Sequence, residues 1–197
     1  MRVTVFGANG RTGRVVVRLL GERGHEVVAF VRDGSRFEGP DGVEVVEGDA
    51  RDAAAVDRAL AGADAFVSVL SLRSADDEPE YSDATRAIVE AATRAGVRRA
   101  VVTANNDVLT DREVTGEYAA QAREHRRNRE TLGSSLLDWT VLAAPWVTDD
   151  EPLGSYVANL DERGPNRRIA FADFALAVVD ALGHDDWVGH VVGVSAP

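Results

Sequence analysis

Three glycines near the start of the chain have a spacing that can hold a phosphate. They occupy positions 7, 10 and 13 in the segment GANGRTG, between the apolar run RVTVF and a helical pattern over residues 11–23. Glycine lets the backbone approach a pyrophosphate, and the N-terminus of the following helix supplies N–H donors and a partial positive charge. A strand before and a helix after such glycines favour a dinucleotide site over a simple turn, which is the alternative interpretation. The residues assigned to this site are Gly7, Asn9, Gly10, Arg11, Thr12 and Gly13.

The end of the second predicted strand carries residues that distinguish two forms of such a cofactor. At this position an acidic side chain reads a ribose 2′-hydroxyl, whereas an arginine accepts a 2′-phosphate. The sequence VRD offers both as Arg32 and Asp33, and Arg36 adds a second cation. Because arginine binds phosphate through paired hydrogen bonds, we favour NADP over NAD and expect Asp33 to face solvent or cap the following turn. The alternative is that these charges belong to a solvated loop.

Further candidate contacts follow the third and fourth predicted strands. Asp49, in the segment GDARD, either accepts from an adenine amino group or belongs only to a turn ahead of the helix-capping Asp52, and both interpretations stay open. The segment SVLS ends the fourth strand, where ligands of parallel sheets bind. Ser68 and Ser71 are therefore candidates for contacts to a nicotinamide ribose.

These residues lie on a regular alternation of strands and helices, which predicts βαβ units with a parallel sheet. Predicted strands cover about 2–6, 26–31, 43–47, 64–70, 98–103, 138–143 and 189–194, and predicted helices cover about 11–23, 52–61, 81–95, 117–134 and 172–182. Several strands are apolar on both faces, as in a sheet covered by helices on each side. We expect an α/β fold with a doubly wound parallel sheet of Rossmann type, as a single domain over 1–197. Residues 145–170 are expected to form a substrate-side loop or lid.

The composition excludes several kinds of chemistry. The 197 residues include no cysteine and no lysine, so disulfides, thiolate nucleophiles, Cys-based metal sites and Schiff bases are excluded. We find no cluster that supports a metal site. The net charge of −11 argues against nucleic acid or a membrane surface as partner and leaves a small-molecule substrate. Without a long apolar run or a signal-peptide pattern, the protein is expected to be soluble and cytoplasmic. An acidic, lysine-free surface also suggests the hypothesis of adaptation to high salt.

The opening motif resembles that of the atypical short-chain dehydrogenases/reductases, which carry GATGxxG where this chain has GANGRTG. Many such relatives use a tyrosine and a lysine one helical turn apart, because the lysine lowers the tyrosine pKa for proton transfer. Tyr118 lies near that position, but Ala122 stands four residues on. Alcohol oxidation, epimerisation and dehydration are therefore disfavoured. Hydride transfer to a flat conjugated acceptor, such as a flavin, quinone or linear tetrapyrrole, remains, since its delocalised product anion needs mainly alignment and exclusion of water.

Across nearly its whole length the chain resembles the flavin reductase/biliverdin-IXβ reductase branch of the NAD(P)H-binding, NmrA-like group. The segments that carry the resemblance are GANGRTG, FVRDGSR, EGDARD, EHRRNRETLGSSLLDWTVLAAP and RGPNRRIAFADFALAVVDAL. The resemblance implies an NADPH-dependent reductase with a serine beside the reacting ring after the fifth strand. In this chain the register puts Asn105 there, as a candidate for substrate positioning through its amide.

Other side chains are open to two interpretations. His125 is interpreted as a surface or packing residue in preference to a catalytic one. Trp146 and Tyr156 either lie against a flat substrate or serve core packing and lid anchoring. The alternative to a reductase is a non-catalytic NADP(H)-binding sensor or regulator of the NmrA-like type.

Overall fold

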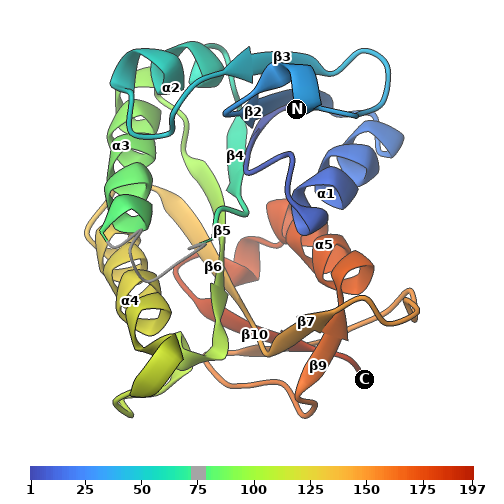
Figure 1. Cartoon of the computed structure of the whole chain (residues 1–197), viewed down its shortest axis with the longest axis vertical. Helices are drawn as coiled ribbons and strands as arrows, with labels where there is room; N and C mark the ends of the chain where they lie inside the picture. Colours follow the sequence, from blue (N-terminus) through green and yellow to red (C-terminus); the bar gives the residue numbers. More distant parts are fainter. Residues whose placement is uncertain (72–78) are drawn as a thin grey trace.

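The computed structural model describes residues 1–71 and 79–197. Within these ranges an eight-stranded sheet has the order β3-β2-β1-β4-β5-β6-β10-β8, and β7 pairs with β9 separately (Figure 1). The strands of the large sheet are β3 (Glu44–Glu47), β2 (Glu26–Val31), β1 (Arg2–Phe6), β4 (Ala65–Ser68), β5 (Arg99–Asn105), β6 (Asp138–Ala144), β10 (Val191–Ser195) and β8 (Val157–Leu160). All of its pairs are parallel except that of β10 with β8.

Helices cover both faces of this sheet (Figure 1). One face holds α1 (Arg11–Glu22) and α5 (Phe171–Asp180), and the other holds α2 (Ala53–Leu60), α3 (Glu80–Ala95) and α4 (Ala119–Gly133). The described helices include none with the length and hydrophobicity of a membrane span. The α/β prediction, a doubly wound Rossmann-type sheet in one domain, is therefore confirmed.

The side-chain alternation of β1 explains how the sheet separates two apolar cores. Val3 and Val5 pack with α1 and α5, whereas Phe6 packs on the other side against Phe30 of β2, with ring centroids 5.0 Å apart. Buried Thr4 faces the same side as Phe6, and its hydroxyl donates to the Ala59 carbonyl oxygen of α2 at 2.6 Å. Each fully buried valine contributes about 1.5–3 kcal/mol through loss of hydration, and the paired hydroxyl avoids a desolvation penalty.

The segment 145–170 contains more regular structure than the sequence indicated. Short strands β7 (Trp146–Thr148) and β9 (Arg168–Ala170) pair in parallel, and β8 lies antiparallel at the edge of the main sheet. Asp173 of α5 holds the intervening chain, because its carboxylate accepts from the backbone N–H groups of Leu153 and Gly154 at 2.9 and 2.8 Å. These hydrogen bonds tie the 145–170 segment to the first turn of α5.

Candidate functional site

Two cavities lie at the carboxyl ends of the parallel strands, where the strand order reverses between β1 and β4. Their volumes are about 410 and 650 Å³. They meet at the glycine loop and the end of β4, since both are lined by Gly10, Val69, Leu70 and Ser71. Ligands of open α/β sheets bind at such a switch point. The two cavities therefore form one elongated site.

The glycine loop is built as the sequence predicted. Gly7 has φ +85, and a Cβ on Gly13 would lie 2.1 Å from the Gly7 carbonyl oxygen, so this packing of loop against helix requires glycine. The N-cap of α1 is Gly10, which has no capping side chain, and the first turn of the helix contains no acidic residue. The partial positive charge of the helix N-terminus is thus left for an anion.

Two side chains of the loop differ in their surroundings. Asn9 lines the first cavity, and its Oδ1 is buried without a partner in the described part of the chain. Arg11 lines the second cavity with Thr12, but its guanidinium pairs with Asp149 at 3.0 Å and lies 4.2 Å from the centroid of the Phe171 ring. In this state Arg11 therefore joins the glycine loop to the 145–170 segment.

The first cavity contains the residues expected to choose between NAD and NADP. Arg32 and Arg36 both line it and are exposed, and neither guanidinium forms an ion pair or hydrogen bond with another described residue. Asp33 Oδ1 accepts from the backbone N and the Oγ of Ser35 at 3.1 and 2.6 Å, which caps the short 3-10 helix Gly34–Arg36. The predicted capping role of Asp33 is confirmed. Sequence reasoning missed Arg14, which lines the same cavity and pairs with Glu38.

Asp49 lines the first cavity, and its carboxylate is already engaged. Oδ1 accepts from the backbone N and Nε of Arg51 at 2.9 and 3.0 Å, and Oδ2 accepts from Nη2 at 2.8 Å. These hydrogen bonds lower the pKa of Asp49 to about 2. The guanidinium also reaches Glu80 at the start of α3 at 2.7 Å. Of the two interpretations, the geometry favours a structured turn, beside which Phe30 and Ala50 supply apolar lining.

The two serines at and just after the end of β4 differ in whether they line the cavities. Ser71 lines both cavities, as expected for a residue beside the cofactor. Ser68 lines neither, because it lies inside β4 between Phe6 of β1 and Val102 of β5 and is 2% exposed. The hydroxyl contact predicted for Ser68 therefore has no support in this structure.

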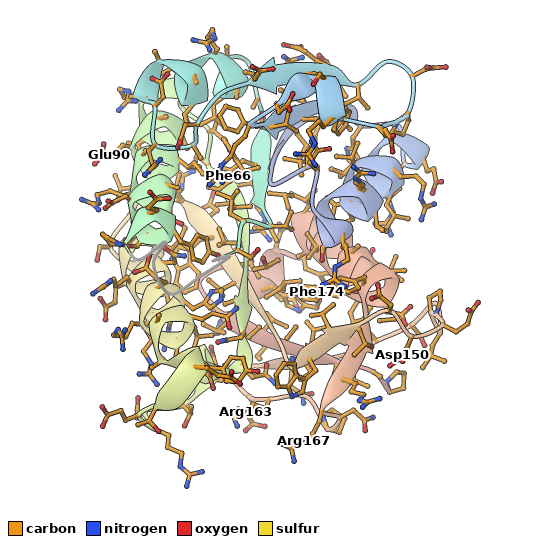
Figure 2. All side chains as sticks on the ribbon, in the orientation of Figure 1. Phe66, Glu90, Asp150, Arg163, Arg167 and Phe174 are labelled. Atoms are coloured by element: carbon orange, nitrogen blue, oxygen red, sulfur yellow. The ribbon has the colours of Figure 1, made fainter. Side chains whose placement is uncertain are left out.

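Asn105 ends β5 and lines the second cavity. Its Oδ1 accepts from the backbone N of Asp107 at 3.2 Å and caps the 3-10 helix Asn106–Leu109, so its amide nitrogen remains a donor. Arg163 donates from Nε and Nη2 to the Asn106 carbonyl oxygen at 3.2 and 3.1 Å. Figure 2 shows Arg163 and Arg167 on the lower side of the molecule, below Phe174. All three line the second cavity.

An aromatic pair borders the second cavity. Tyr118 ends the 3-10 helix Gly116–Tyr118, and its ring meets Trp146 edge to face with centroids 5.5 Å apart. The two side chains are 42% and 59% exposed and both line the cavity. Ala122 is buried in α4. Tyr156 lines neither cavity, and its hydroxyl donates to Asp180 at 2.7 Å, which favours the anchoring interpretation for that residue.

His125 packs in the interior, in agreement with its interpretation as a surface or packing residue in preference to a catalytic one, and it also borders the second cavity. It is 5% exposed, lines the second cavity and meets the Tyr81 ring edge to face with centroids 5.3 Å apart. Burial lowers its pKa to about 4. The sequence contained a signal for this burial, because His125, Asn128 and Leu132 are spaced so that they share one face of a helix, which is the buried face of α4.

Comparison with known proteins gives relatives along the whole chain. The model of a family described as NAD(P)H-binding matches residues 7–185. The uncharacterised protein YwnB of Bacillus subtilis is 28% identical over 204 residues, with 94% of each chain covered. The 3-diazoavenalumate denitrifying reductase of a Streptomyces species is 42% identical over 113 residues, which cover 51% of this chain and 36% of that protein.

Solved structures share the fold at low sequence identity. A candidate NADH-flavin reductase from Streptococcus pneumoniae has a TM-score of 0.85 with 21% identity and 100% of both chains covered. A short-chain dehydrogenase/reductase from Veillonella parvula, solved in complex with NADP, has a TM-score of 0.79 with 18% identity and covers 100% of this chain and 94% of its own. The chain therefore has the fold of Rossmann-type NAD(P)-binding oxidoreductases.

Proposed function

Because the chain belongs to the NAD(P)H-binding family, we propose that it is an NADPH-dependent reductase that passes a hydride to a flat conjugated acceptor, such as a flavin, a quinone or a linear tetrapyrrole. One observation carries this proposal: two cavities meet at an uncapped helix N-terminus, one with two arginines that have no ion-pair partner among the described residues and the other with an aromatic border. The first suits the adenosine half of a dinucleotide, and the second suits its nicotinamide and the acceptor.

The residues present fit the cofactor. The glycine loop leaves no room for a Cβ at Gly13, the first turn of its helix contains no acidic residue, and Asn9 Oδ1 is a buried acceptor without a partner among the described residues. Gly7, Asn9, Gly10, Thr12 and Gly13 would hold the pyrophosphate and its riboses, with Arg11 joining once it leaves Asp149. When bound, reduced nicotinamide supplies the hydride.

The proposed preference for NADPH over NADH rests on the position of the Asp33 carboxylate as well as on the positive charges of Arg32 and Arg36. Reading a 2′-hydroxyl requires an acceptor aimed at the ribose, but Asp33 Oδ1 is engaged by Ser35. Arg32 and Arg36 line the same cavity without a carboxylate partner in the described ranges. A 2′-phosphate would give both guanidinium groups a charge-assisted partner, which strengthens binding of the phosphorylated cofactor.

The second cavity favours an acceptor that needs no acid–base pair. Tyr118 has Ala122 four residues on, so no basic side chain at that position lowers the pKa of its hydroxyl. Trp146 is largely exposed beside Tyr118 and lines the cavity, so its ring is available to a flat conjugated molecule. The 145–170 segment supplies Trp146, Val147 and Arg167 to this cavity, and we propose it as the wall on the substrate side. Reductase names among similar proteins support the same class of reaction.

Steady-state oxidation of NADPH, followed by nicotinamide absorbance, tests the proposal with FMN, FAD and menadione as acceptors. We expect turnover with at least one acceptor and a lower kcat/KM for NADH. Trp146→Ala raises the KM for the acceptor, whereas Leu153→Ala, which removes an exposed apolar side chain of the same segment outside both cavities, leaves it unchanged. Tight NADPH binding without turnover with any acceptor would instead favour the non-catalytic sensor.

A further inference from the structure

His125 is a buried polar side chain for which the described residues supply no hydrogen bond. It lines the larger cavity, and its Nδ1 is enclosed without a partner in the described part of the chain. A buried ring nitrogen left unpaired costs about 1–3 kcal/mol. Such a group in a ligand cavity therefore requires either a compensating contact from a ligand or a structural reason for its presence.

The surrounding contacts hold this imidazole in a fixed position. The Tyr81 ring packs edge to face against it from α3, and the Tyr81 hydroxyl donates to the Thr103 carbonyl oxygen at the end of β5. The neighbouring Glu124, fully buried, accepts from the backbone N and Oγ of Ser82 at 2.8 and 3.2 Å and so ties α4 to the first turn of α3. A side chain held this way can meet a ligand without reorganisation.

The protonation state of His125 determines what it can offer. Burial lowers its pKa to about 4, so the ring is neutral at physiological pH and carries one N–H. Buried N–H groups without a partner are rarer in proteins than buried acceptors without one. The enclosed Nδ1 is therefore assigned as the unprotonated nitrogen. The proton then sits on Nε2, on the opposite edge of the ring. A neutral imidazole can thus act as a hydrogen-bond donor towards an oxygen on which negative charge develops.

We propose that neutral His125 donates a hydrogen bond from Nε2 to a carbonyl oxygen of the acceptor, and that the acceptor is a quinone or flavin in which this carbonyl is conjugated to the atom that receives the hydride. This inference rests on the proposed function. The acceptor gains two electrons and one proton as hydride and takes a second proton from water, while the cofactor is oxidised and His125 keeps its proton. The amide nitrogen of Asn105, which lines the same cavity, is a second neutral donor for such a carbonyl.

Three variants test this role. His125→Phe keeps a ring against Tyr81 but removes the donor, and His125→Gln keeps an N–H donor on a different side chain. His184→Phe is the matched control, because His184 stacks on Trp187 at 4.1 Å and lines neither cavity. Thermal melting of each variant reports its folding, and NADPH affinity, measured by nicotinamide fluorescence, is expected to stay within about twofold of wild type.

With menadione as acceptor, His125→Phe is expected to lower kcat by about 10- to 100-fold with a smaller change in KM, since a donor that strengthens as charge develops acts on the transition state. His125→Gln recovers part of the loss, and His184→Phe retains wild-type kcat.

A readout independent of turnover uses 1-naphthol bound to the protein saturated with NADP⁺. The naphtholate absorbance should show that His125→Phe reduces the ionisation constant of bound naphthol by about 10- to 100-fold relative to wild type.

The outcomes separate this proposal from the proposed function. If wild-type protein oxidises NADPH with menadione and His125→Phe does so equally fast, the role of His125 is refuted and the reductase function stands. If wild type oxidises no NADPH, the reductase function fails, and the naphthol measurement still decides whether His125 donates to a bound oxyanion. Naphthol that ionises in the wild-type complex as it does free in water overturns the proposal without any variant.

Discussion

Removal of the Arg32 guanidinium should weaken NADPH binding and leave NADH binding nearly unchanged. Arg32 lines the first cavity, is exposed and has no ion-pair partner within the described ranges, so its replacement by alanine breaks no salt bridge of the fold. It affects Asp49 only as a minor cause, because the hydrogen bonds from Arg51 dominate the low pKa of that carboxyl. The effect of Arg32→Ala is therefore concentrated on a ligand that carries a 2′-phosphate.

The expected magnitude follows from the contact that is lost. A hydrogen bond to a charged group contributes about 1.5–3 kcal/mol, so the Kd for NADPH should rise about 10- to 150-fold. NADH lacks the 2′-phosphate, and its Kd should change less than about twofold. Arg36→Ala should act in the same direction, because Arg36 lines the same cavity without a carboxylate partner in the described chain.

Arg18→Ala provides the control for the loss of one positive charge. Arg18 lies on α1 outside both cavities and pairs with Glu22 at 2.7 Å. Titration of nicotinamide fluorescence gives both Kd values for all variants at one ionic strength. Equal weakening of NADPH and NADH by Arg32→Ala, or no weakening of either, would refute the assignment of Arg32 to the 2′-phosphate.

Three further predictions concern the loop, the buried histidine and the surface. Gly13→Ala would bring a Cβ within 2.1 Å of the Gly7 carbonyl oxygen, so melting temperature and NADPH affinity should both fall, whereas Gly21→Ala, with nothing within 4 Å, should stabilise α1 by up to about 1 kcal/mol. Unchanged NADPH binding by Gly13→Ala would contradict this account of the loop. The folded-state pKa of His125 is about 4, below the ordinary 6.5, so the unfolded chain binds a proton that the folded chain does not, and stability should fall by on the order of 3 kcal/mol as pH drops from about 6.5 to 4. Tyr81 packs against the imidazole, and the charged side chains of Arg11, Asp107, Arg163 and Arg167 line the same cavity. Urea unfolding of His125→Phe should lack this loss, and a curve parallel to wild type would argue against a buried neutral ring. With 33 acidic and 22 basic residues, the free energy of unfolding should rise from low to molar salt because screening weakens self-repulsion, and a flat response would remove the salt-adaptation hypothesis.

The fold and the glycine loop were predictable because their signals are local. A strand, three spaced glycines and a helix lie within some twenty residues. The turn at Asp33-Gly34 is capped by the Asp33 carboxylate, which accepts from the backbone N–H of Ser35, two residues further along the chain. The alternation of apolar strands and helices likewise requires no knowledge of distant contacts. These parts of the structure follow from propensities that act over one or two turns of chain.

The second cavity depended on long-range packing that the sequence does not display. Trp146 and Arg167 reach it because β7 pairs with β9 across some twenty residues of chain, in a segment whose composition indicated a loop. The sequence left open whether His125 lies at the surface or is packed, because α4 is rich in charged residues that obscure its narrow buried face. Ser68 was assigned to the site from its place at a strand end, but strand alternation turned its side chain into the interior.

The most direct test of the central claim is a single-turnover reaction of the protein with NADPH deuterated at nicotinamide C4 on either face, mixed with menadione or FMN. We predict oxidation of the bound NADPH with a primary isotope effect for one of the two deuterated forms, because a site that fixes the ring presents only one face to the acceptor. NADPH that binds tightly and is not oxidised by any acceptor would contradict the account.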